Sequence, residues 1–186
     1  LKCSACQTVF FFFRIQTFCP NCQAPLVAYY DLEKARAEVD RDYISHQHGG
    51  MWRWHAVLPV QNPEHVITLG EGDTPLLHLP RLGAQKGFSN LLIKDESLNP
   101  TGSFKARGLA AAISRAHELG VDKVVIPTAG NAGGAMAAYA SRGGMQSYIF
   151  MPRDTPVANI KESRIAGATV ILIQGLISEA AGMAGE

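Results

Sequence analysis

Lys105 occupies an unusual position for a lysine, at the end of a segment of turn-forming residues. The run 99–105 reads Asn-Pro-Thr-Gly-Ser-Phe-Lys, and a helical pattern of apolar residues follows it. Ser103 is typical of a helix N-cap, which places Lys105 in the first turn. There the helix dipole and partial burial favour the neutral amine, the form that attacks a carbonyl. The segment predicts a nucleophilic lysine; the alternative is a solvated lysine beside Arg107 as a second surface cation.

A second segment places small residues and an amide where another helix should begin. Residues 127–135 read Pro-Thr-Ala-Gly-Asn-Ala-Gly-Gly-Ala and follow the apolar run 124–126. Free N–H groups at the start of a helix bind anions, and small side chains allow a ligand to approach them closely. The same glycines also suit a helix packed tightly on its neighbours, and the two interpretations are compatible.

All four cysteines lie within residues 1–30, as the pairs Cys3/Cys6 and Cys19/Cys22. Two Cys-x-x-Cys turns can complete a tetrahedral thiolate site, so the spacing predicts a structural Zn²⁺ with no open position. Metal binding would supply the folding free energy that so small a module lacks. Disulfides, which a cytoplasmic location disfavours, and a redox Cys-x-x-Cys are the alternatives. The aromatic run 10–13 is expected on the intervening hairpin, packed against the rest of the chain.

The pattern from residue 66 onward alternates between strands and helices, which is typical of an α/β fold whose parallel sheet has helices on both faces. Ligands bind beyond the carboxyl ends of such strands, so we expect the loops 99–105 and 128–131 to face one crevice. The expected strands are 91–94 (buried), 124–126, 147–151 and 170–173, and the expected helices are 31–39, 104–119, 132–141, 159–166 and 178–186.

The chain divides into a small zinc-ribbon-like module (1–30), a helical linker segment (31–65) and an α/β region (66–186), with residues 45–50 as the best boundary. A net charge of +1 gives no reason to expect nucleic acid as a partner. No apolar run approaches the roughly 20 residues of a membrane span, so no membrane partner and a cytoplasmic location are expected. Three histidines with loose spacing are interpreted as loop residues rather than a metal site: His46, His48 and His55.

Four segments together resemble threonine synthase, a pyridoxal-phosphate enzyme of the tryptophan-synthase-β (fold type II) superfamily. The N-terminal cysteines are similar to the zinc ribbon of some members of that family. Because both ends look cut, the chain is expected to be the front part of a longer enzyme. The four segments are Lys94–Gly108, Leu69–Leu76, Pro127–Ala135, and Trp52-Arg53-Trp54 with Leu58-Pro59.

The resemblance implies a role for particular residues. Lys105 would bind pyridoxal phosphate covalently and move protons, and Asn131 would bond the phenolic oxygen of the cofactor. The cofactor set is Phe104, Lys105 and Asn131, and the set that holds the substrate carboxylate is Thr128, Ala129, Gly130, Asn131 and Ala132.

The family reaction converts O-phospho-L-homoserine and water to L-threonine and phosphate, and the family favours homodimers. The loop that grips the cofactor phosphate and the group facing the pyridine nitrogen lie downstream of residue 186 in the family. The isolated fragment is therefore expected to bind cofactor poorly and to be inactive.

Two other kinds of function stay open. A related fold type II enzyme, such as threonine dehydratase or cysteate synthase, could share these motifs. The second alternative is a non-catalytic zinc-ribbon adaptor with a degenerate enzyme domain, although intact Lys105 and Asn131 argue against the loss of catalytic residues.

Asp95 and Glu96 resemble a catalytic carboxylate pair but are expected to buttress the loop. The segment 72–74 is expected to shape the entry to the small domain rather than to do chemistry. Trp52 and Trp54 are expected to pack rather than bind.

Overall fold

The computed structural model describes residues 1–47 and 49–185. His48, one of the three loop histidines, and Glu186, the last residue of the predicted final helix, lie outside the described residues. None of the helices in the described ranges combines the length and the apolar character that a membrane span requires.

A parallel sheet forms the centre of the C-terminal half. Its strands are β5 (Lys123–Pro127), β6 (Gln146–Pro152) and β7 (Thr169–Ile173), in the order β5-β6-β7. Both neighbouring pairs are parallel, with Val125 opposite Tyr148 and Ile149 opposite Val170. The connections are the helices α5 (Asn131–Arg142) and α6 (Val157–Ile165). The predicted alternation and its strands after residue 120 are confirmed.

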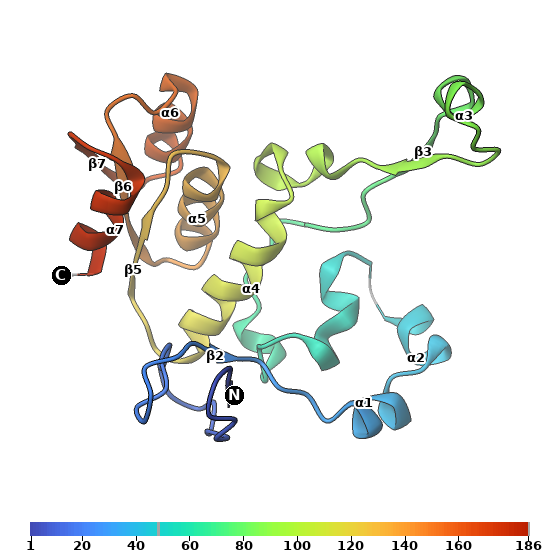
Figure 1. The fold of residues 1–186 in the computed structure, drawn as a ribbon, viewed down its shortest axis with the longest axis horizontal. Coiled ribbons are helices and arrows are strands. Elements are labelled where there is room, and N and C mark those ends of the chain that lie inside the picture. Colours follow the sequence, from blue (N-terminus) through green and yellow to red (C-terminus); the bar gives the residue numbers. More distant parts are fainter. Residues whose placement is uncertain (48, 186) are drawn as a thin grey trace.

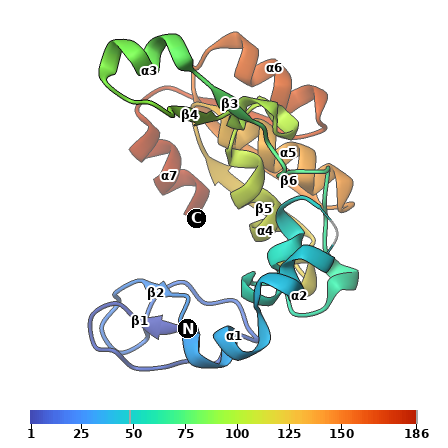
Figure 2. The same cartoon turned by 90° about the vertical axis from the view of Figure 1, so that its right-hand side faces the viewer.

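Helices cover both faces of this sheet. In Figures 1 and 2, α5 and α6 lie on one side, and α7 (Ile177–Gly185) packs against β5 and β6 from the other. A further helix, α4 (Lys105–Glu118), packs against α5 and shares one core with it. Alanines allow the two helix axes to approach closely, since a methyl group takes little space at the contact. The core residues of the pair are Ala106, Ala110, Ile113, Met136, Ala137, Tyr139 and Ala140.

The strand before the lysine segment departs from the prediction. Strand β4 (Leu92–Lys94) pairs antiparallel with β3 (Leu76–His78) and takes no part in the parallel sheet. Leu92 and Ile93 are each 45% exposed, so the prediction of a buried strand was wrong. An apolar run of three residues cannot reveal its pairing partner. Helix α3 (Pro80–Lys86) connects the two strands, and this unit projects away from the sheet (Figure 1).

The N-terminal module is held by one short antiparallel pair, β1 (Lys2–Cys3) and β2 (Leu26–Val27). The aromatic run 10–13 lies between the two cysteine pairs, but Phe11 and Phe13 are 80% and 68% exposed. The prediction that this run packs against the rest of the chain was therefore wrong for these two rings. Phe12 does reach α4, where its carbonyl accepts a hydrogen bond from Arg115.

Short helices follow the N-terminal module along the chain. Helix α1 (Leu32–Glu38) was predicted, whereas α2 (Arg41–His46) overlaps the segment expected to be a linker. Each helix is capped by an aspartate: Asp31 accepts from the Lys34 N–H and Asp40 from the Tyr43 N–H. Two 3₁₀ helices follow, at Met51–Val57 and Pro63–His65.

Candidate active site

Ser103 begins helix α4 in the way its type predicts. Its backbone is extended (φ −158°, ψ 160°), and its Oγ accepts from the Lys105 N–H at 3.3 Å. Its carbonyl accepts from the Ala106 N–H at 3.2 Å. The regular helix begins at Lys105 and is preceded by Phe104 in helical conformation (φ −60°, ψ −14°), so Ser103 caps the turn that leads into the helix and Lys105 lies in the first helical turn. The preceding turn, Pro100–Gly102, contains Thr101 at φ 63°, a left-handed conformation that is rare for a β-branched residue.

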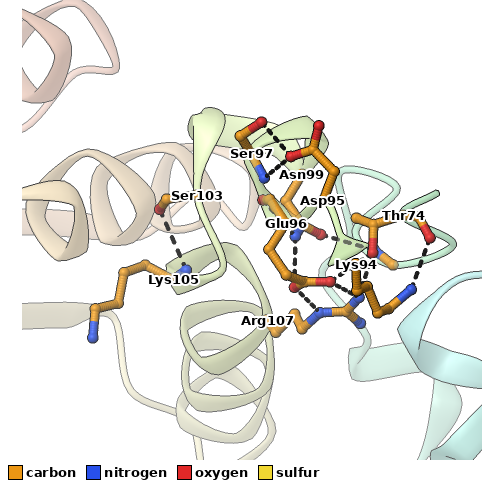
Figure 3. Close-up of polar contacts among 10 residues, drawn as sticks. Thr74, Lys94, Asp95, Glu96, Ser97, Asn99, Ser103, Lys105 and Arg107 are labelled. Atoms are coloured by element: carbon orange, nitrogen blue, oxygen red, sulfur yellow. Dashed lines mark hydrogen bonds and ion pairs between the residues drawn. The ribbon is translucent and has the colours of Figure 1, made fainter. Parts of the chain in front are cut away.

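Lys105 and Arg107 point to opposite sides of α4 (Figure 3). Two residues on a helix are about 200° apart around its axis, so this divergence follows from their spacing. The Lys105 Nζ lies 4.5 Å from the centre of the Phe104 ring, and no carboxylate pairs with it in the described part of the chain. Arg107 binds both oxygens of Glu96, at 2.6 and 2.8 Å. Arg107 is thus not a second surface cation beside the lysine.

Glu96 organises the segment before the lysine. Besides Arg107, its carboxylate accepts from Thr74 Oγ1 at 2.6 Å and from Asn99 Nδ2 at 2.9 Å (Figure 3). The bonds from Arg107 and then Thr74 lower the pKa of Glu96 from 4.5 to about 2. Neighbouring Asp95 accepts from the backbone and hydroxyl of Ser97. The expectation that both carboxylates buttress the loop is confirmed.

The segment around residue 72 connects this network to the middle of the chain. Gly72 donates its N–H to Asn99 Oδ1 at 3.1 Å and adopts φ +106°. A Cβ there would lie 2.4 Å from the Met51 nitrogen, so only glycine fits. Asp73 accepts from the Gly50 N–H and pairs with Arg53 at 2.9 Å. These contacts hold the segment in place, and its role at the entry to a small domain stays a prediction.

The second loop forms the N-terminus of α5. Thr128 Oγ1 accepts from the Gly130 N–H at 3.2 Å, and Gly130, in extended conformation, caps the helix with no side-chain bond. Within residues 1–47 and 49–185, no acceptor contacts the N–H groups of Asn131 and Ala132. Their free N–H groups and the helix dipole favour an anion at this end.

Helix packing brings the two loops together. The turn Pro100–Gly102 and helix α4 both contact α5. The expectation that both loops follow strands of one parallel sheet was therefore wrong, because β4 lies outside that sheet. The buried Thr101 hydroxyl, in the turn before Lys105, has no partner among the described residues. A free amine on one helix and free N–H groups at the start of the helix packed against it can hold an anionic ligand that carries a carbonyl group.

A buried carboxylate that the sequence analysis missed supports this region. Glu71 is 1% exposed and accepts from Trp52 Nε1 at 2.6 Å, from Tyr139 Oη at 2.6 Å and from the Leu69 N–H at 3.0 Å. Burial, and then the bond to Glu71, raises the pKa of Tyr139. Trp52 therefore packs and donates, whereas Trp54 is 45% exposed. The only sequence signal for this site was a lone glutamate between two glycines.

The four cysteines converge as their spacing predicted. Their sulfur atoms lie within 4.8 Å of one another, with Cys3–Cys22 at 3.4 Å and Cys6–Cys19 at 3.6 Å. A tetrahedral zinc site with Zn–S bonds of about 2.3 Å has sulfurs about 3.8 Å apart, so the set fits the ion. All four are free thiols, which argues against the disulfide alternative. In the described part of the chain this is the one group of three or more side chains that could hold a metal, and it contains no histidine.

Several known proteins are similar to this chain. Residues 67–186 match the family model described as pyridoxal-phosphate dependent enzyme. The threonine synthase of Methanocaldococcus jannaschii is 33% identical over 164 residues, which cover 88% of this chain and 40% of the relative. That of Synechocystis sp. is 39% identical over 125 residues, 66% of this chain and 33% of the relative.

A solved structure of maize serine racemase superposes with a TM-score of 0.56 at 26% identity, covering 60% of this chain and 34% of that one. The chain spans less than half the length of each of these relatives. The lysine in the first turn of α4, the glycine-rich start of α5 and the family match lead to one conclusion: the chain belongs to the pyridoxal-phosphate-dependent enzymes of fold type II.

Proposed function

We propose that this chain is part of a threonine synthase, which converts O-phospho-L-homoserine and water to L-threonine and phosphate. The observation that carries the proposal is the position of Lys105, whose amine is turned away from the carboxylates while the preceding turn packs on α5. The curated threonine synthases that align with this chain favour that reaction over others of the same fold.

The residues present fit pyridoxal phosphate. Lys105 supplies an amine that no carboxylate pairs among the described residues, and the start of α5 supplies free donors for anionic groups. When bound, the cofactor supplies an electron-withdrawing ring. Lys105 would bind it covalently and afterwards hold or release a proton at Nζ, with Phe104 beside it. Asn131 would donate to an oxygen of the cofactor.

The loop at the start of α5 is the proposed substrate site. Its N–H groups would orient the carboxylate of a phosphorylated amino acid, and its small side chains leave room for that approach. A Cβ built on Gly130 would meet nothing within 4 Å, which supports open space at this point. The residues proposed for this role are Thr128, Ala129, Gly130, Asn131 and Ala132.

The N-terminal cysteines are proposed to hold a structural Zn²⁺. The hydrogen bond between Cys6 and Thr8 lowers the pKa of the Cys6 thiol to about 6, whereas hydrogen bonds to the neighbouring cysteines raise that of Cys22 to about 11, and thiolate is the form that binds metal. The backbone N–H groups of Ala5 and Cys6 also donate to Cys3 Sγ, at 3.4 Å each.

Three further points remain predictions: the domain boundaries after residues 30 and 65, a homodimeric state and a cytoplasmic location.

An absorbance spectrum of the full-length protein with pyridoxal phosphate, beside its Lys105→Ala variant, tests the proposal. A visible band that is lost in the variant is the expected result. The same spectrum in both proteins would refute the role of Lys105, and no band in either would favour a zinc-ribbon adaptor. Product analysis with O-phosphohomoserine, threonine and O-phosphoserine then separates threonine synthase from threonine dehydratase and cysteate synthase.

A further inference from the structure

A second asparagine, Asn159, contacts the amide of Asn131. Asn159 Nδ2 donates to Asn131 Oδ1 at 3.3 Å. Asn131 is the first residue of α5, and Asn159 lies in the first turn of α6. These helices follow the neighbouring parallel strands β5 and β6, so both helix starts lie at the same edge of the sheet.

The contact fixes which end of the Asn131 amide is available. A side-chain amide accepts at its oxygen and donates only at its nitrogen. With Oδ1 bound to Asn159, the nitrogen Nδ2 is directed elsewhere, and it has no acceptor among the residues that the structure describes. Against an Asn159 amide that keeps its observed orientation, the reversed Asn131 amide would set two NH₂ groups against each other, which costs a hydrogen bond and adds repulsion. In the observed pairing Asn131 therefore offers donors to a ligand.

Close packing of the two helices supports this contact. A Cβ on Gly133 would lie 3.2 Å from Ser163 Oγ, and one on Gly134 would lie 2.3 Å from the carboxyl carbon of Glu162. The absence of these side chains lets α6 lie directly on the first turn of α5. Burial in this contact raises the pKa of the Glu162 carboxyl. The helix starts are thus held at a fixed separation, which an amide pair requires.

We propose that Asn159 is a positioning residue that orients Asn131 to donate through Nδ2 to an anionic oxygen of pyridoxal phosphate. This inference rests on the proposed function, because it takes the ligand from there. Asn159 itself stays outside the ligand site and acts through Asn131. The expected consequence is a contribution of Asn159 to cofactor affinity that depends entirely on the amide of Asn131.

Two substitutions at one position separate orientation from simple contact. Asn159→Ala removes the donor and leaves the Asn131 amide free to rotate. Asn159→Asp keeps the size but can only accept, so it attracts Nδ2 and turns Oδ1 toward the cofactor. The matched control is Ala158→Asp, which adds the same charge at the exposed neighbouring position.

The readout is the dissociation constant of pyridoxal phosphate in the full-length protein, followed by the visible band that depends on Lys105. Asn159→Ala should weaken binding by about 2- to 10-fold, as for one lost neutral hydrogen bond. Asn159→Asp should weaken it by about 10- to 100-fold, and Ala158→Asp by less than about 2-fold. Equal effects of the two aspartates would overturn the inference, because charge alone would explain them.

A double-mutant cycle gives the decisive result. In an Asn131→Ala background, Asn159→Asp should change the dissociation constant by less than about 2-fold, because the amide that it reorients is gone. An undiminished effect in that background would show a role independent of Asn131 and overturn the inference. Unchanged affinity in both Asn159 variants, with a normal wild-type band, would overturn it while leaving the proposed function intact. A wild-type protein without a Lys105-dependent band would refute both.

Discussion

Replacing Glu96 by glutamine tests whether this carboxylate stabilises the lysine segment through its charge. The side chain binds Arg107, Thr74 and Asn99 at once. Glutamine keeps the shape but loses the charge, and its NH₂ group must face a donor, since all three partners of Glu96 donate. We expect Glu96→Gln to lower the free energy of unfolding at pH 7.

The magnitude follows from the pKa of Glu96. The folded-state value of about 2 lies below the ordinary 4.5, so the stabilisation is complete above pH 4.5 and is lost as pH falls toward 2. At about 1.4 kcal/mol per pH unit the difference corresponds to about 3 kcal/mol. The side chain is 29% exposed, and solvent screens part of this energy. We therefore expect Glu96→Gln to cost about 2 kcal/mol.

Urea unfolding of both proteins at pH 7, 5, 4 and 3, followed by tryptophan fluorescence, measures this cost. The difference between wild type and variant should narrow steadily below pH 4.5. A difference that stays constant down to pH 3 would show that shape, rather than charge, matters, and would refute the reasoning. Glu38→Gln serves as a control, because Glu38 is an exposed residue whose pair with Lys34 is 3.9 Å long, and it should change stability little at any pH.

Three further perturbations follow from the structure. Tyr139→Phe removes a hydrogen-bond donor from buried Glu71 and should lower the free energy of unfolding, measured in urea, by about 1–3 kcal/mol. Because the folded protein raises the pKa of Tyr139, the stability of the wild type should fall above pH 10 more than that of the variant. Gly72→Ala should cost about 2–5 kcal/mol through backbone overlap at φ +106°, whereas Gly87→Ala, at φ +77° with open space, should cost about 1 kcal/mol. Cys19→Ser should abolish the one Zn²⁺ per chain expected from metal analysis; equal zinc in both proteins would contradict the four-thiolate site.

The elements that the sequence predicted well carry their own start and stop signals. Ser103 caps α4, and Gly120 (φ +76°) follows its end, so the lysine's place in the first turn was readable locally. The cysteine site was predictable for the same reason, because its spacing within 20 residues sets the geometry. Strand β4 was predicted wrongly, because its apolar residues contain no information about which strand pairs with it.

The features that were missed are polar contacts between distant parts of the chain. Glu71 meets Trp52 and Tyr139, which lie 19 and 68 positions away, and Asn131 meets Asn159, 28 positions away. Such pairs form only after the helices have packed, and no local pattern encodes them. Tertiary packing decides which glutamate or asparagine is buried and bonded, whereas residue type alone decides only what each could bond.

The opposite directions of Lys105 and Arg107 make the length of their segment a constraint in its own right. Adding or deleting one residue between Lys105 and Arg107 would turn these two side chains by about 100° relative to each other around the helix axis. The guanidinium and the amine could not then both keep their places, although every residue type was preserved. The start of the helix should accept an exchange at an exposed position such as Gly108 and reject changes of length between the two residues, so it acts as a fixed spacer between a structural anchor and a reactive group.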